Sequence, residues 1–325
     1  MDTKNKIFNS LTMVMSFVPL FILVSIFVFV LYYSFPAIQY MGIRFFTTYL
    51  WYPGIESRPP VHVNGVTAPY ASSYGLILFL TGTLVSSALA IIIALPLSFF
   101  SSIAVELYLP SRMKKVLISI IELFAGIPSV VYGLWGIIVL EPVLFYYIEP
   151  WMKDNLSSVP GFAGEIYSGA GILASAIILA IMITPIIVSV MVNSFDTVPV
   201  EIKQGIISLG ATKWELGKYL ITGYSRMSTY GGTLLGLGRA LGETMAVLMV
   251  SGAVVNVLPS SFYSAINTMA AAVASLLDSA FFDSTGMSIA ALSELSLVLM
   301  IISLTVNVLG RRIAGRGALR GVELD

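Results

Sequence analysis

The chain has 325 residues, of which 57% are hydrophobic and 10% charged, with a formal net charge of zero. Soluble domains carry roughly 25% charged residues, so this composition excludes an ordinary soluble fold and indicates apolar segments buried in a bilayer. The absence of cysteine excludes disulfides, and the single histidine, His62, lies in a polar stretch that argues against a histidine metal site. The zero net charge gives no electrostatic reason to expect nucleic-acid binding.

Six apolar stretches reach the length of about 20 residues that a helix needs to cross a bilayer. They are Leu11–Tyr33, Tyr74–Ser98, Val116–Leu140, Ala170–Val192, Thr229–Val254 and Met287–Leu309. The pattern predicts an all-α fold, a polytopic transmembrane bundle of about six spanning helices. The first stretch follows Lys4 and Lys6, as a signal peptide would, but its apolar run is too long and no small-residue cleavage site follows, so an anchor helix is favoured.

The placement of lysine and arginine predicts the orientation in the cell membrane. With the N-terminus inside, the inner segments hold Lys4, Lys6, Arg112, Lys114, Lys115, Lys203, Lys213, Lys218, Arg226, Arg311, Arg312, Arg316 and Arg320. The outer segments hold only Arg44, Arg58 and Lys153. Because positive residues concentrate on the cytoplasmic side, both termini are predicted to be cytoplasmic in a multi-pass protein.

Three regions follow from these spans. Residues 1–73 form an anchor helix with an extracytoplasmic loop, residues 74–310 a transmembrane domain, and residues 311–325 a cytoplasmic tail. The outer loop, roughly 34–73, is too long for a simple connection, and its role is open. An inner loop at about 193–227 is also too long for a simple connection.

The inner loop has the signals of two short helices. Pro199 followed by Glu201 is typical of a helix start. Gly210 suits a left-handed turn, after which Thr212 can cap a second helix with Glu215 in a capping box. From the residues alone, two interfacial helices that only cover the bundle are the favoured interpretation.

Charged residues interrupt three of the apolar stretches. Arg239 lies about 16 Å from the cytoplasmic end of its helix at about 1.5 Å per residue, and a charge at that depth costs at least about 2.5–3.5 kcal/mol. Glu243, four residues on, can pair with Arg239 within one helix, and such a pair could simply fix helix register. Glu122 and Glu294 add two further acids in other stretches, so a translocation path lined by ionisable groups is favoured.

The third stretch contains a proline near the middle of the bilayer. Pro128 lacks a backbone donor and is expected to bend or break the helix just before Ser129 and Tyr132. Broken helices at the midplane often mark substrate sites in transporters, although a kink used only for packing explains the proline equally well.

Two of these segments resemble a known transporter family. Ala125–Gly133, which reads Ala-Gly-Ile-Pro-Ser-Val-Val-Tyr-Gly, and Gly236–Val247, which contains Gly-Arg-Ala-Leu-Gly-Glu-Thr-Met-Ala, are similar to the PstC family of phosphate permeases among the ABC importers. Met245-Ala246 favours PstC over the partner family PstA. The inner loop from Val198 to Glu215 resembles the coupling loop of ABC importers, although Gln204, Gly205 and Ile206 replace its Glu-Ala-Ala and Thr222-Gly223 its closing Leu-Pro.

The resemblance covers residues 45–310 and implies a type I ABC importer permease fold and a subunit that moves phosphate by alternating access. It also implies a second PstA-like permease, a cytosolic PstB-like ATPase dimer and an extracytoplasmic phosphate-binding protein, with no cofactor on this chain. The implied pathway residues are Arg239, Glu243, Glu122, Glu294, Ser129 and Tyr132. The implied ATPase-docking residues are Glu201, Gln204, Gly205, Leu209, Gly210, Ala211, Thr212 and Trp214.

Other functions compete with this interpretation. A permease for sulfate or molybdate is the nearest alternative, and a passive channel or scaffold is another. An intramembrane enzyme is disfavoured, since the chain has neither His-Glu-x-x-His nor Gly-x-Ser-x-Gly. The sequence also lacks Gly-x-x-x-x-Gly-Lys-Ser/Thr, so ATP hydrolysis is expected on a separate chain and this chain is not expected to be an enzyme.

Overall fold

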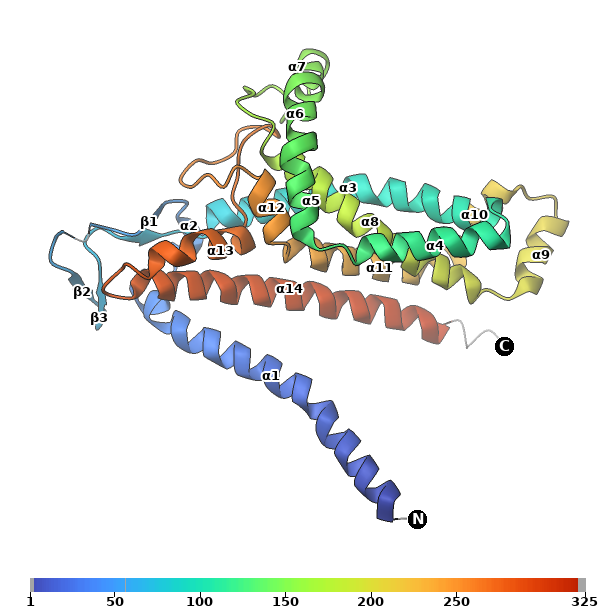
Figure 1. The fold of residues 1–325 in the computed structure, drawn as a ribbon, viewed down its shortest axis with the longest axis horizontal. Coiled ribbons are helices and arrows are strands. Elements are labelled where there is room, and N and C mark those ends of the chain that lie inside the picture. Colours follow the sequence, from blue (N-terminus) through green and yellow to red (C-terminus); the bar gives the residue numbers. More distant parts are fainter. Residues whose placement is uncertain (1–2, 56, 321–325) are drawn as a thin grey trace. The chain divides into compact units, whose positions relative to one another are not determined.

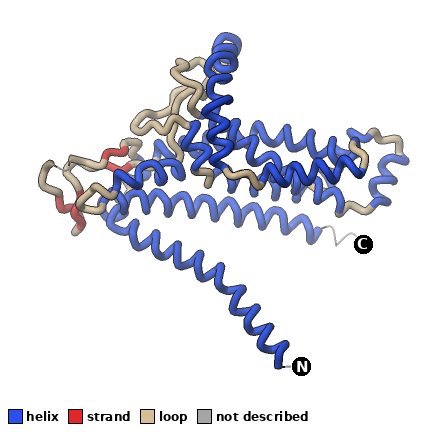
Figure 2. Tube along the Cα trace, viewed as in Figure 1, coloured by secondary structure: helices blue, strands red, loops and turns tan. Residues whose placement is uncertain are grey.

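A computed structural model describes residues 3–55 and 57–320, and the side chains of residues 11–55 and 57–312. The described chain is mostly helical, and its few strands form two small antiparallel pairs (Figures 1 and 2). It divides into two compact units, one made of Met1–Leu76 with Leu276–Met300 and the other of Ile77–Ser275 with Ile301–Asp325. The prediction of an all-α polytopic protein is confirmed.

The first unit consists of a long helix, a small outer β structure and the first part of the last helix. Its elements are α1 (Thr3–Met41), α2 (Arg44–Thr47), β1 (Trp51–Tyr52), β2 (Val61–Val63), β3 (Val66–Ala68), β4 (Ser73–Tyr74) and the start of α14 (Met287–Arg320). Strand β1 pairs with β4, and β2 pairs with β3 through a turn at Asn64-Gly65, where both residues have positive φ. The predicted outer loop therefore starts later than expected, because α1 continues to Met41.

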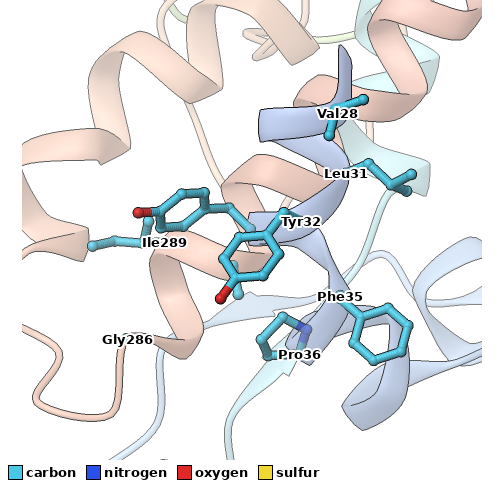
Figure 3. A pocket seen from close by; sticks show the side chains of 9 residues that line it. Val28, Leu31, Tyr32, Phe35, Pro36, Gly286 and Ile289 are labelled. Carbon is cyan, nitrogen blue, oxygen red and sulfur yellow. The ribbon is translucent and has the colours of Figure 1, made fainter. Parts of the chain in front are cut away.

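An apolar cavity of about 660 Å³ lies in this unit between the C-terminal half of α1 and the start of α14 (Figure 3). Val28, Tyr32 and Pro36 line it from α1, and Gly286 and Ile289 line it from the other side. The large side chains of α1 from Leu11 to Leu31 are exposed around the helix. Because exposed apolar surface on this scale requires an apolar neighbour, lipid or another membrane chain has to cover α1.

The second unit is a helical bundle arranged around α8 (Ile172–Asp196), whose Ile183, Ile187 and Met191 are fully buried. The other elements are α3 (Ile77–Ile103), η1 (Ala104–Tyr108), α4 (Ser111–Ala125), α5 (Ser129–Trp135), η2 (Gly136–Leu140), α6 (Glu141–Val143), η3 (Leu144–Ile148), α7 (Glu149–Leu156), α9 (Val200–Ser208), α10 (Lys213–Tyr219), η4 (Leu220–Tyr224), α11 (Arg226–Leu241), α12 (Met245–Val250) and α13 (Met269–Ala280), which runs on into the first unit. The elements labelled η are π-helical turns. Helices α3, α4 and α11 pack directly on α8.

Glycines allow α11 to approach its neighbours closely. A β-carbon added at Gly232 or Gly236 would lie 3.1 Å from Val190 or Ile187 of α8. At Gly238 it would lie 2.7 Å from the Asn307 side chain of α14. Small residues in membrane helices permit this backbone proximity, as the repeated glycines of this stretch predict.

Five described helices are long and apolar enough to cross a membrane: Leu11–Met41, Ile77–Tyr108, Ser129–Leu156, Ile172–Asp196 and Met287–Arg312. The prediction of single helices over Val116–Leu140 and Thr229–Val254 is wrong. The first is broken before Ser129, because Pro128 is extended, and its spanning segment continues to Leu156. The second is broken between Leu241 and Met245. Of the predicted tail, 311–320 continue α14, and 321–325 lie outside the described residues.

Candidate functional site

The breaks in the two interrupted helices lie next to each other. Helix α5 begins just after the first break, and α12 begins just after the second (Figure 1). A β-carbon added at Gly133 of α5 would lie 3.1 Å from the α-carbon of Ala246 and 2.7 Å from the sulfur of Met249. Glycine at position 133 therefore brings α5 against α12 and brings the two breaks together.

Tyr132 bridges the first break. Its buried hydroxyl donates a hydrogen bond to the carbonyl oxygen of Phe124, in the last turn of α4, at 2.9 Å. Ser129, half-buried, is the first residue of α5. Tyr132 and Ser129 thus lie at the start of α5, whereas Arg239 lies in the last turn of α11, and their membership of one path stays a prediction.

Arg239 and Glu243 do not form the predicted ion pair. Arg239 is exposed in the last turn of α11, whereas Glu243 lies in the break and is only 8% exposed. The Glu243 carboxylate accepts a hydrogen bond from the Ala246 backbone N–H at 3.2 Å, so it caps α12. Because the helix stops between them, the spacing of four residues no longer puts both side chains on one face. Within the described chain, Arg239 has no carboxylate partner.

The two other predicted acids occupy different surroundings. Glu122 is exposed on α4 and makes no side-chain hydrogen bond or ion pair within residues 3–55 and 57–320. Glu294 is 3% exposed in the first unit, and its Oε2 atom has no hydrogen-bond partner among the described residues. Their role in a path stays a prediction.

The inner loop folds as its sequence predicts. Helix α9 ends just before Gly210, which has a φ of +89°. Thr212 and Glu215 form the capping box of α10: the Thr212 backbone N–H donates to the Glu215 carboxylate at 2.8 Å, and the Glu215 N–H donates to the Thr212 hydroxyl at 3.3 Å. Hydrogen bonds from the backbone and the hydroxyl of Thr212 lower the pKa of Glu215.

The turn between α9 and α10 is an exposed tip with an apolar residue on it. Leu209 is 89% exposed, and Glu201, Gln204 and Gly205 on α9 are also exposed. A β-carbon at Gly205 or Gly210 would meet nothing within 4 Å. An exposed leucine beside open glycines leaves room for a partner to approach the backbone. The half-buried Ala211 and the exposed Thr212 complete the predicted docking set except for Trp214.

Trp214 contacts the bundle itself. Its ring stacks on Phe100 of α3, with centroids 5.8 Å apart and planes at 13°, and meets Phe99 edge-on at 5.9 Å. Three residues further on, Gly217 packs against Ile103. This side chain therefore anchors α10 to the end of α3, a position distinct from the exposed tip.

A cluster of four charged residues beneath the inner loop was missed by the sequence reasoning. Lys203 of α9 donates to Glu106 of η1 at 3.0 Å, and Lys114 of α4 donates both to Glu106 and, at 2.8 Å, to Asp196 of α8. The Glu106 side chain is 6% exposed. Burial alone would lower the pKa of Lys114, but hydrogen bonds to Asp196 and Glu106 raise it above its usual value. The only signal in the sequence is that Lys114 and Asp196 lie within four residues of the ends of apolar stretches.

At the other end of the second unit, the loops 157–171 and 251–268 lie beside α6 (tan in Figure 2). The Phe262 backbone N–H donates to the Gly161 carbonyl oxygen at 2.9 Å and so joins the two loops, and the Leu173 N–H, in the first turn of α8, donates to the Phe262 carbonyl oxygen at 3.0 Å. Phe162 also packs edge-on against Phe262. Glu149 of α7 is 1% exposed, and its Oε2 atom has no hydrogen-bond partner in the described chain.

Comparisons with known proteins give close relatives in sequence. The chain is 39% identical over 290 residues to "Phosphate transport system permease protein PstC 1" of Mycobacterium tuberculosis, covering 88% of this chain and 84% of that protein. It is 37% identical to the PstC of Haemophilus influenzae, covering 75% and 76%. It is 34% identical to the probable PstC of Methanocaldococcus jannaschii, covering 93% and 91%.

The other two comparisons add little. No family model matches the chain. A solved chain of the MetNI methionine ABC transporter, in an inward-facing conformation, has 15% sequence identity and a TM-score of 0.47, and the match covers 73% of this chain and 91% of that chain.

Proposed function

Because the chain belongs to the PstC family of phosphate transport system permeases, we propose that it is the membrane subunit through which an ATP-driven importer moves inorganic phosphate. Alternating access of the helical bundle carries the anion across, and ATP is hydrolysed on another chain. The absence of a phosphate-binding Gly-x-x-x-x-Gly-Lys-Ser/Thr segment from this sequence supports that division of work.

The observation that carries the proposal is the unpaired Arg239 beside the two helix breaks. A guanidinium fits an oxyanion with two parallel hydrogen bonds, and no carboxylate in the described chain occupies this one. Tyr132, in the first turn of α5, lies beside the same breaks and can add a hydroxyl. Glu243 is buried and bonds to the α12 backbone, so it leaves Arg239 free for the anion. Its carboxylate also discourages a phosphate from remaining bound.

The partners follow from the same family membership. A PstA-like permease completes the path, a PstB-like ATPase dimer binds the tip at Leu209 and Gly210, and an extracytoplasmic phosphate-binding protein delivers the anion. The exposure of the tip supports the ATPase contact. The concentration of lysine and arginine on one side supports cytoplasmic N- and C-termini, which puts the tip on the side where ATP is available.

Transport by the complete complex tests the proposal. Membrane vesicles that hold this chain with its three partner proteins should accumulate labelled phosphate only when ATP is supplied on the ATPase side. An equal concentration of unlabelled sulfate or molybdate should leave the rate unchanged, whereas unlabelled phosphate should compete.

Two results would overturn the assignment. Accumulation of labelled sulfate or molybdate in preference to phosphate would make the chain a permease for another oxyanion. Phosphate flow that runs without ATP would make it a passive channel. Vesicles in which the ATPase subunit carries an inactivating change in its own nucleotide site provide the matched control.

A further inference from the structure

We propose that Glu106 is a positioning residue that links the coupling loop to the transmembrane helices, an inference that rests on the proposed function. It would transmit movement of α9, when the ATPase acts on the loop tip, to the cytoplasmic ends of α3, α4 and α8. Its carboxylate is the shared acceptor of two lysines that come from different elements.

The four charges connect four elements of the second unit through a single chain of contacts. Lys203 brings α9 to Glu106 in η1, at the end of α3, and Lys114 joins Glu106 to the first turn of α4. Asp196, the last residue of α8, accepts the second contact of Lys114 at 2.8 Å. Two acids balance two bases, so loss of any one member leaves an excess charge in the cluster.

The centre of this cluster is shielded from water. The Glu106 side chain is 6% exposed, and those of Lys114 and Lys203 are 19% and 21% exposed. Ion pairs on an open surface contribute little and are screened by salt, whereas shielded pairs hold their geometry more strongly. The contacts around Glu106 are therefore suited to carry displacement between helices.

Both helices of the coupling loop converge on the same short segment of chain. Helix α9 reaches it through Lys203 and Glu106, and α10 reaches it through Trp214 on Phe99 and Phe100. The segment from Phe99 to Tyr108 ends in the π-helical turn η1, after which the chain becomes extended at Leu109. A push on the tip therefore reaches the end of α3 through the ionic contact of Lys203, the aromatic contact of Trp214 and the packing of Gly217 on Ile103.

Substitutions that keep the size of the side chain but remove its charge test the inference in the complete complex. In Glu106→Gln and Lys203→Met, we expect the ATPase to remain bound and to hydrolyse ATP. The number of anions imported per ATP should fall by roughly fivefold or more, the lower end of a typical coupling free energy between sites. Lys203→Arg, which keeps the positive charge, should restore most of the ratio.

The matched control is Lys218→Met on α10, since Lys218 is exposed and forms no ion pair in the described chain. It should leave the ratio unchanged. An unchanged ratio in Glu106→Gln, or equal losses in Lys203→Arg and Lys203→Met, would overturn the inference, and so would release of the ATPase by Glu106→Gln. The ratio is measured with whichever oxyanion the unmodified complex imports. A complex that imports another oxyanion would overturn the proposed phosphate function, and the role of Glu106 would still be tested with that anion.

Discussion

The Arg239 guanidinium has no carboxylate partner in the part of the chain that the structure describes. If it binds the anion, Arg239→Ala should reduce phosphate uptake by at least roughly tenfold, because a hydrogen bond to a charged group contributes about 1.5–3 kcal/mol. Arg239→Lys should retain part of the uptake, since an ammonium keeps the charge but loses the two-pronged geometry. The measurement is labelled-phosphate uptake, normalised to the amount of inserted protein.

Arg226→Ala provides the matched control, because Arg226 is exposed at the first turn of the same helix α11. It removes the same charge far from the break and should leave uptake near normal. Normal phosphate uptake by Arg239→Ala would show that Arg239 has no role in the translocation path.

Asp283 organises the turn that leads into α14. Its carboxylate accepts hydrogen bonds from the Thr285 N–H at 2.9 Å, the Thr285 hydroxyl at 2.7 Å and the Ser288 N–H at 2.7 Å. Asp283→Ala leaves these buried donors without an acceptor and should destabilise the protein by about 1–3 kcal/mol. A lower midpoint of thermal unfolding in detergent would show this, with Asp278→Ala, a change at an exposed acid of α13, as the control.

The same carboxylate predicts a dependence on pH. Burial alone would raise the pKa of Asp283, but the hydrogen bonds from Thr285 and Ser288 outweigh it, so the pKa lies below its ordinary value of 3.8. A lowered pKa means that the stabilisation is complete above that ordinary value and is lost as the pH falls through the pKa of the folded protein. The difference in unfolding midpoint between the unmodified protein and Asp283→Ala should therefore be constant from pH 7 to about pH 5 and narrow below pH 3.8. A difference in unfolding midpoint that stays the same at every pH would contradict the lowered pKa of Asp283.

At the scale of elements, the α9–turn–α10 unit depends on one backbone conformation. Gly210 has a φ of +89°, and a side chain there would meet no other atom within 4 Å, so only the backbone resists substitution. In Gly210→Val, the left-handed backbone conformation of the turn should cost about 1–2 kcal/mol of free energy. The affinity of the permease for the ATPase should therefore fall roughly tenfold. Co-purification of the ATPase with the permease measures this.

Gly65→Val in the outer hairpin is the control for strain, because Gly65 also has positive φ and open space around it. It should leave ATPase retention unchanged. Equal retention by Gly210→Val and the unmodified chain would argue that the tip is not the docking site.

The sequence predicts where helices form better than it predicts where they are interrupted. The long aliphatic runs of α8 and α14 predict their helices because nothing else satisfies so many apolar residues in a bilayer. Pro128 carries a local signal for its break. The break between Leu241 and Met245 has no comparably strong signal, because Gly-Glu-Thr is compatible with a helix.

At the scale of the whole molecule, the sequence predicts a polytopic helical protein but does not predict the ionic contacts between distant residues. Lys203 and Glu106 are 97 residues apart, and Lys114 and Asp196 are 82 apart, so no local pattern pairs them. Arg239 and Tyr132 were both predicted to belong to one path, since charge and proline inside apolar runs are conspicuous. The contact of α5 with α12, at Gly133 and Ala246, is a tertiary feature that no local pattern predicts.

Orientation can be tested directly because the chain contains no cysteine. With both termini cytoplasmic, a membrane-impermeant thiol reagent should label Ser57→Cys in intact cells and should label Ser208→Cys only after the membrane is opened. Both positions are exposed, one in the outer loop and one at the end of α9. Labelling of Ser208→Cys in intact cells would reverse the topology, and retained phosphate uptake by both variants controls for folding.

The stack of Trp214 on Phe100 gives this protein an internal optical reporter. An indole that leaves an aromatic neighbour for water shifts its emission, and this indole lies between the coupling loop and α3. Only three other tryptophans are present, Trp51, Trp135 and Trp151, and none of them lies on α9 or α10. With those three replaced by phenylalanine, the emission of the remaining residue would follow the joint between α10 and α3 in real time through each ATP cycle, with no dye attached.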